Sequence, residues 1–334
     1  MTSPLLIEWR TVLSGDDGVK FAPQIALLFT SVNPLQPSTP TPLARGAGIA
    51  LLLVIAVVFG ANHVAARLAF DHGLSITTAV AIRSAGTALF VLALLLAMRV
   101  SVALPTPTLG RALAIGLVLS VQSYCLYSSV ARIPAALALL VFNVHPMLLT
   151  LISWAAGGAR PSTRSLAVMP IALIGLALAL DIAGSGTFTG RWSDIGTGAA
   201  YAFAAAIAFA TAMFLSARWL PGVDGRLRSC LTMAAVAVVA FAAGTATNTL
   251  ALPVDREAWI GLALLTLFYG TAITSLFVLL PRLRSASDIA ALNFEPIAVL
   301  LGAWVLLGQG LAPLQIVGAV IVVGSIVTLG VGRR

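Results

Sequence analysis

Long apolar runs dominate the chain from residue 46 onward, and short polar segments separate them. The runs are continuous rather than alternating, which favours helices over membrane β-strands. Because a helix needs roughly 20 apolar residues to cross a bilayer, the pattern predicts an all-α integral membrane protein with ten transmembrane helices. The predicted spans are 46–70, 75–98, 110–130, 134–155, 164–182, 194–217, 228–250, 256–281, 286–307 and 313–332.

The composition strengthens the prediction that lipid surrounds most of the chain. Charged residues make up 9% of the sequence and hydrophobic residues 60%, whereas roughly a quarter of a soluble domain is charged. The 19 Lys and Arg residues exceed the 11 Asp and Glu residues, but they stand singly or in pairs between apolar runs. We therefore expect a bilayer as partner and no nucleic acid.

The basic residues also predict how the chain is threaded through the membrane. Alternate loops, counted with the two termini, hold 14 Lys and Arg residues on one side and four on the other, and Arg83 lies within a span. Basic residues concentrate on the cytoplasmic side, so we expect a multi-pass cell-membrane protein with both termini cytoplasmic. Residues 1–45 contain no run long enough to span, and we interpret them as a mobile cytoplasmic leader.

The two halves of the chain match each other at an offset of 150 residues. Between 131–160 and 281–310, seven of 30 positions are identical: Arg132/Arg282, Ala136/Ala286, Asn143/Asn293, Pro146/Pro296, Leu151/Leu301, Trp154/Trp304 and Gly158/Gly308. We infer one five-helix repeat at 46–182 and a second at 194–334, joined by a linker at 183–193. Since five is odd, the second repeat enters the membrane in the opposite sense, as in many secondary transporters.

Several motifs then resemble a known family. They are Phe59-Gly60-Ala61-Asn62, Arg67, Arg83, the paired Asn143-Val144-His145-Pro146 and Asn293-Phe294-Glu295-Pro296, and the Pro-led last span from Pro313 to Gly318. In order and spacing they resemble the EamA-type ten-helix members of the drug/metabolite transporter superfamily. Where such members often carry Glu after the glycine that ends the fourth and ninth spans, this chain has Ala159 and Gln309. The resemblance implies transport of a small molecule without a cofactor.

Ionisable groups inside a bilayer are costly, and each is a candidate for function. Glu295 lies near the middle of the ninth span beside the helix-breaking Pro296, where it can load and release a proton; a neutral, packed Glu is the alternative. His145, beside Pro146, occupies the matching position in the fourth span and is a second protonation site or a packed core residue. Arg83 can pair with Glu295, bind a substrate carboxylate, or extend to the membrane interface.

Three asparagines complete the set of candidate substrate-binding residues. Asn62, Asn143 and Asn293 lie within spans, where interhelical hydrogen bonds explain such residues as often as substrate contacts do. The three His residues do not form a metal-ligand pair at helical spacing, and we predict no metal site.

Taken together, these features favour a secondary transporter over three other classes. We expect a proton-coupled exporter of a small metabolite, an amino-acid-like compound or a drug-like amphiphile, working by alternating access and compatible with a homodimer. The sequence lacks Walker, GxSxG and HExxH motifs, which disfavours ATP drive and an embedded enzyme. A channel or a regulatory membrane protein remains an alternative, although no selectivity element is evident.

Overall fold

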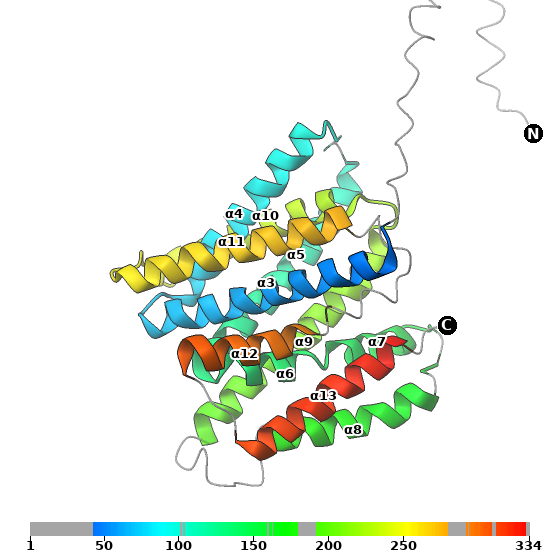
Figure 1. Ribbon diagram of the computed structural model, residues 1–334. Helices are drawn as coiled ribbons and strands as arrows, with labels where there is room; N and C mark the ends of the chain where they lie inside the picture. Colours follow the sequence, from blue (N-terminus) through cyan, green and yellow to red (C-terminus); the bar gives the residue numbers. More distant parts are fainter. Residues whose placement is uncertain are drawn as a thin grey trace, which may run out of the picture. The chain divides into compact units, whose positions relative to one another are not determined.

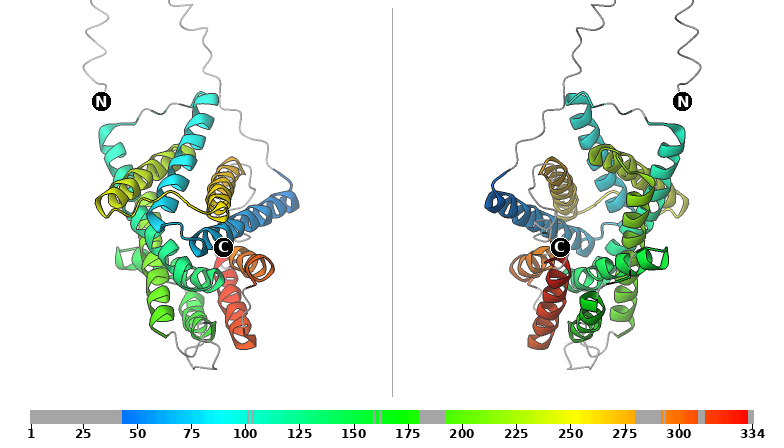
Figure 2. Two further views of the ribbon diagram at one scale, coloured as in Figure 1. Left: turned by 90° about the vertical axis from the view of Figure 1, so that its left-hand side faces the viewer. Right: turned by 90° about the vertical axis from the view of Figure 1, so that its right-hand side faces the viewer.

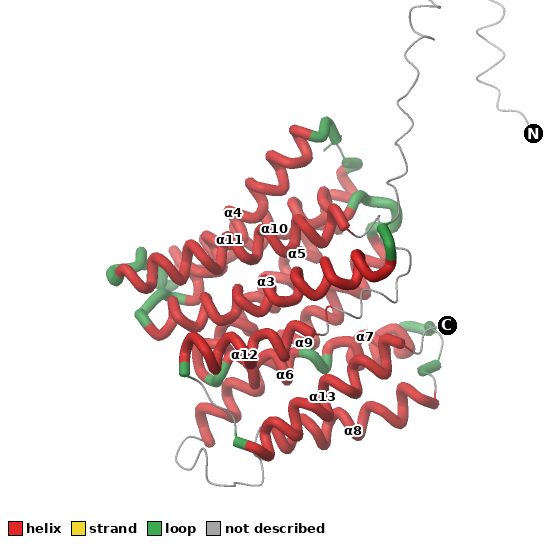
Figure 3. The backbone as a smooth tube through the Cα atoms, viewed as in Figure 1, coloured by secondary structure: helices red, strands yellow, loops and turns green. Residues whose placement is uncertain are grey.

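The computed structural model describes residues 43–100, 102, 104–158, 160–161, 163–179, 192–279, 292, 294–308 and 312–331. These residues form α-helices and no strand (Figure 3). The helices are α3 (Arg45–Asp71), α4 (Ile76–Ala97), α5 (Thr106–Arg132), α6 (Ala135–Phe142), α7 (His145–Ala155), α8 (Thr163–Ala179), α9 (Trp192–Trp219), α10 (Gly225–Ala246), α11 (Arg256–Leu279), α12 (Glu295–Leu307) and α13 (Pro313–Val331). Residues 1–42 of the leader, most of the linker and Asn293 lie outside the described residues.

Seven helical stretches in this part of the chain are long and apolar enough to cross a membrane, counting α6 and α7 as one. They are Gly46–Asp71, Ile76–Ala97, Thr106–Arg132, Ala135–Ala155, Ile195–Trp219, Gly225–Ala246 and Arg256–Leu276. Two shorter apolar helical stretches, Glu295–Leu306 and Ile316–Ser325, fall where the ninth and tenth spans are predicted. The all-helical membrane fold is therefore confirmed, whereas the number of ten spans stays a prediction.

The helices pack mainly with partners that are distant in sequence. α3 lies beside α11, α4 beside α10, α5 beside α9 and α8 beside α13 (Figures 1 and 2). α3 also contacts α12, and α9 contacts both α6 and α7. Each half of the chain thus supplies one helix to every principal pair.

Close approach of α3 to its neighbours depends on glycines. A Cβ atom on Gly60 would lie 3.0 Å from the Cβ of Ala298 in α12, and one on Gly261 of α11 would lie 2.7 Å from the Cβ of Ala69. Small residues allow helices to approach closely in lipid. These close approaches hold α3 against both α11 and α12.

The fourth predicted span is not one continuous helix. It breaks at Asn143 and Val144, which form a turn between α6 and α7. Pro146 explains the break: proline has no backbone N–H to continue the helical ladder, and its ring crowds the preceding turn. The side-chain amide of Asn143 donates to the carbonyl of Leu139 at 2.7 Å and satisfies the end of α6. α12 begins in the same register, at Glu295 followed by Pro296.

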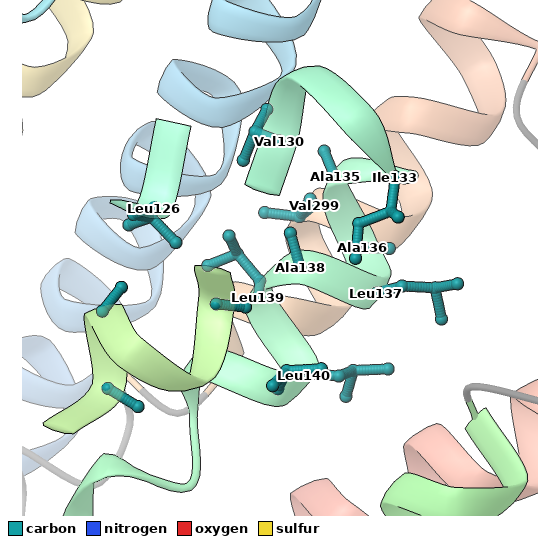
Figure 4. Packing of buried hydrophobic residues seen from close by; sticks show 14 of the residues in the cluster. Leu126, Val130, Ile133, Ala135, Ala136, Leu137, Ala138, Leu139, Leu140 and Val299 are labelled. Atoms are coloured by element: carbon teal, nitrogen blue, oxygen red, sulfur yellow. The ribbon is translucent and has the colours of Figure 1, made fainter. Parts of the chain in front are cut away.

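The short helix α6 lies at the centre of the largest apolar cluster. All its residues from Ala135 to Val141 are buried, and they pack against α5, α9 and Val299 of α12 (Figure 4). An all-apolar helix also suits contact with lipid, so it is the burial of these side chains, and not their composition, that places α6 inside the bundle. The core thus fixes the break between α6 and α7 relative to the start of α12.

Candidate functional site

Glu295, at the first position of α12, lies in direct polar contact with His63 of α3. The Nε2 atom of His63 lies 3.3 Å from Oε1 of Glu295. The His63 side chain is 9% exposed and that of Glu295 is 25% exposed, so the carboxylate is the more accessible member of the pair. Two ionisable groups in contact inside a membrane-spanning bundle are a strong indication of function.

Arg83 of α4 is buried and is held mainly by aromatic rings. Its guanidinium carbon lies 3.9 Å from the ring centroid of Tyr269 in α11 and 5.2 Å from that of Tyr127 in α5. Cation–π contacts of this kind strengthen when water is excluded. The Nη2 atom also lies within hydrogen-bond distance of Ser84 and Ser123. Among the described residues Arg83 makes no ion pair, so the carboxylate of Glu295 belongs to His63 and not to Arg83.

Tyr127 connects these two groups. Its hydroxyl donates to the side-chain oxygen of Asn62 at 3.4 Å, and its ring lies 6.2 Å from that of His63, centroid to centroid. Since Tyr127 also contacts Arg83, one buried phenol contacts three of the polar residues. We call Asn62, His63, Arg83, Tyr127, Tyr269 and Glu295 the polar cluster.

Three nitrogen atoms in the polar cluster have no hydrogen-bond partner. They are Nδ2 of Asn62, Nδ1 of His63 and Nε of Arg83, and all three are buried. Buried polar atoms are nearly always paired, so each exception calls for an explanation. Nδ2 of Asn62 and Nε of Arg83 are donors, and Nδ1 of His63 becomes one when the imidazole is protonated. The cluster can therefore bind oxygen atoms of a substrate.

His145 lies at the start of α7 in a different environment. Its Nδ1 atom lies 3.1 Å from the carbonyl oxygen of Phe142, and its ring packs 5.1 Å from that of Phe142 and 4.9 Å from that of Phe209 in α9. Asn143 is buried and caps α6. The structure therefore brings Glu295, Asn62 and Arg83 into one cluster, and places His145 and Asn143 at the break between α6 and α7.

Sequence reasoning missed the closest partners within this site. His63, Tyr127 and Tyr269 are not among the candidate residues that the sequence singles out. The available signal was the direct adjacency of His63 to the family motif ending at Asn62. As for metals, the described residues contain no group of three His, Cys, Asp or Glu side chains that could hold an ion.

The helical bundle and its buried ionisable cluster define a multi-pass membrane protein with an internal polar site. The EamA-like transporter family model matches the chain twice, over residues 46–180 and 196–331, and the chain belongs to that family. It is therefore a membrane transporter built from two repeats. No curated protein matches the chain. Seventeen chains of solved structures do match; one, described as a crystal structure of a protein, has 20% sequence identity and a TM-score of 0.61, and the match covers 87% of this chain and 99% of that one.

Proposed function

We propose that the protein is a proton-coupled secondary transporter that exports a small metabolite, an amino-acid-like compound or a drug-like amphiphile by alternating access. The proposal rests above all on the contact between the ionisable side chains of His63 and Glu295. An additional proton on this pair changes the net charge of a buried cluster that already contains Arg83. A charged substrate bound at this cluster then has an affinity that depends on whether the His63 and Glu295 side chains carry the additional proton. Such a dependence is the coupling that a proton-driven carrier needs.

Alternating access requires two units of opposite orientation, and the helix contacts support this arrangement. The helices of the two halves correspond in chain order: α3 to α9, α4 to α10, α5 to α11, α6 with α7 to α12, and α8 to α13. When each helix is replaced by its counterpart, the observed α5–α9 contact becomes α11–α3, which is also observed. The same exchange turns α12–α3 into α7–α9 and leaves α4–α10 and α8–α13 unchanged. We infer two inverted five-helix units, with both termini on the cytoplasmic face of the cell membrane.

The unpartnered donors suggest how a substrate is held. A carboxylate placed beside Asn62 and Arg83 accepts hydrogen bonds from Nδ2 and Nε, and bonds to a charged donor are the stronger ones. The rings of Phe59, Tyr127 and Tyr269 lie next to these donors and provide an apolar surface. A compound with a carboxylate and an apolar body fits this combination, and an amino-acid-like substrate is one such compound.

Two experiments test the proposal. A thermal-shift screen of the purified protein against a metabolite library identifies a ligand, whose uptake is then measured in proteoliposomes with and without a pH gradient. We expect saturable uptake, acceleration by ligand on the opposite side, and a response to the gradient. Flux that rises linearly with concentration would instead indicate a channel. Thiol labels introduced near residues 40 and 333 should both react from the cytoplasmic side; reaction from opposite sides rules out the inverted arrangement.

A further inference from the structure

A groove of about 750 Å³ lies between α4, α5 and α10, away from the polar cluster. Its α5 wall includes Ser120 and Cys125 together with Leu117, Val121 and Tyr124. The last three lie on one helix face and are 55%, 56% and 45% exposed. In a chain that spans a bilayer, such exposed apolar side chains face lipid. None of the residues lining the groove carries a charge. The groove is therefore continuous with the lipid-facing surface, and its volume lies within the range of about 300–1,000 Å³ typical of ligand pockets.

One end of the groove carries a row of hydroxyl groups where α4 begins and α10 has ended. Its members are Ser75, Thr77, Thr247 and Thr249, which we call the hydroxyl rim. The Thr77 hydroxyl donates to Thr249, and the Thr247 and Thr249 hydroxyl oxygens are 2.8 Å apart. The rim thus joins the start of α4 to the segment after α10.

The hydrogen atoms of the rim are all used within the protein. Ser75 donates to Thr78, Thr77 donates to Thr249, and Thr247 donates to the carbonyl of Ala243. Since each hydroxyl has one hydrogen, the contact between Thr247 and Thr249 must be donated by Thr249. The rim therefore offers lone pairs to a ligand and no donor. A ligand at the rim must supply N–H or O–H groups itself.

We propose that this groove holds one acyl chain of a bilayer phospholipid whose headgroup carries N–H donors, an ethanolamine phospholipid. The chain lies against Leu117, Val121 and Val239, and the ammonium group donates to the oxygens of the hydroxyl rim. A choline headgroup has the same charge but no N–H, so it leaves these lone pairs unmatched. The inference concerns a lipid-facing site and does not depend on the transport mechanism.

Photoreactive lipids test the proposal on the full-length protein in phosphatidylcholine vesicles. Two probes are compared, a phosphatidylethanolamine and a phosphatidylcholine that carry the same diazirine-labelled acyl chain, and the labelled peptides are mapped by mass spectrometry. We expect the ethanolamine probe to label peptides covering 117–125 and 239–249 several-fold more than the choline probe. Both should label the lipid face of α3 around Leu51 and Val54 equally, because those side chains are exposed and lie outside the groove.

Neighbouring residues of α10 provide matched controls. Val239→Trp fills the groove and should reduce its labelling to the level of the α3 face, whereas Val238→Trp should leave it unchanged, since Val238 is 67% exposed and does not line the groove. Should Val239→Trp fail to fold, Ala243→Leu narrows the same groove at an exposed position. Thr247→Val removes one rim acceptor and should lower the preference for ethanolamine without lowering labelling by the choline probe. Equal labelling of groove and α3 face by both probes, or equal labelling of the groove by the two headgroups, overturns the proposal.

Discussion

The starts of α7 and α12 use the same backbone device for different chemistry. Each helix begins one residue before a proline, at His145 and at Glu295, and these residues are 150 positions apart. At α7 the imidazole packs against Phe142 and Phe209. At α12 the carboxylate contacts His63 of α3. The two repeats thus share a backbone arrangement, while only the start of α12 carries an ionisable pair, and the His63 of that pair comes from the first repeat.

The loops that follow the first helix of each repeat, in contrast, are alike in both backbone conformation and helix capping. Gly73 and Gly222 both have positive φ angles, 82° and 76°, and a capping residue follows each glycine by two positions. Ser75 caps α4 and Asp224 caps α10 through their side-chain oxygens. Here backbone and side chain have equivalent roles in both repeats. The comparison teaches that the two repeats share the features that shape their helices, whereas the side chains at the starts of α7 and α12 differ in their chemistry.

The sharpest test of this difference compares Glu295→Gln with His145→Gln. The first removes the carboxylate that contacts His63, so the acceleration of uptake by a pH gradient should disappear in proteoliposomes. The second replaces a ring that contacts two phenylalanines and should leave that acceleration intact. Loss of the pH response in both variants would mean that the side chains at the starts of α7 and α12 both take part in proton coupling, and would contradict the predicted difference between them.

Replacing His63 by Phe makes the α12 start resemble the α7 start. His63→Phe should lose most of the response to the pH gradient while the protein still folds, since an aromatic ring is tolerated against the helix break in α7. The double variant His63→Phe/Glu295→Gln should lose no more than either single variant, because the two groups act as a unit. Uptake driven by pH is the measurement, and additive losses contradict a coupled pair.

Arg83 tests whether the polar cluster binds a charged substrate. Arg83→Ala should weaken binding of carboxylate-bearing ligands by about tenfold to a hundredfold, as expected for the loss of a charge-assisted hydrogen bond. Neutral analogues should lose much less. Equal losses for both ligand classes, measured by titration of the purified protein, would place Arg83 in packing with Tyr127 and Tyr269 instead.

The sequence was sufficient for the membrane class, the family and the two-repeat pattern, because apolar run length and scarce residues in register are local signals. Glu295 and Arg83 stood out for the same reason, since ionisable groups are rare within spans. The residues that contact Glu295 and Arg83 could not be derived in this way. His63, Tyr127 and Tyr269 reach the site from α3, α5 and α11, and which helix faces meet depends on close packing at residues such as Gly60 and Gly261. The break between α6 and α7 was signalled by Pro146, although the pattern predicted one continuous span.

Asn143 tests whether the break between α6 and α7 contributes to stability alone or also to transport. Asn143→Ala removes the hydrogen bond to the carbonyl of Leu139 and should lower stability by about 0.5–1.5 kcal/mol, the usual net contribution of one hydrogen bond. Coupling to protons should persist, because this amide caps α6 and the ionisable pair lies at α12. Thermal unfolding in detergent measures the first effect and proteoliposome uptake the second. A variant of unchanged stability that fails to bind ligand would reassign Asn143 to the substrate site.

The smallest expected effects come from the two capping residues, which should behave alike except in acid. Ser75→Ala and Asp224→Ala should each cost about 1 kcal/mol, the usual loss for a helix N-cap. The hydrogen bond from the Arg226 side chain holds the pKa of Asp224 below its ordinary value of 3.8, and backbone N–H donors of α10 act in the same direction.

A carboxylate with a lowered pKa stabilises the folded state above its unfolded pKa, and this contribution is lost as the pH falls through the folded value. The stability difference between the wild type and Asp224→Ala should therefore shrink as the pH is lowered below about 4, whereas the difference for Ser75→Ala should stay constant. Thermal unfolding as a function of pH distinguishes the two. If both differences shrink together, the acid dependence arises elsewhere in the molecule and not from the carboxylate of Asp224.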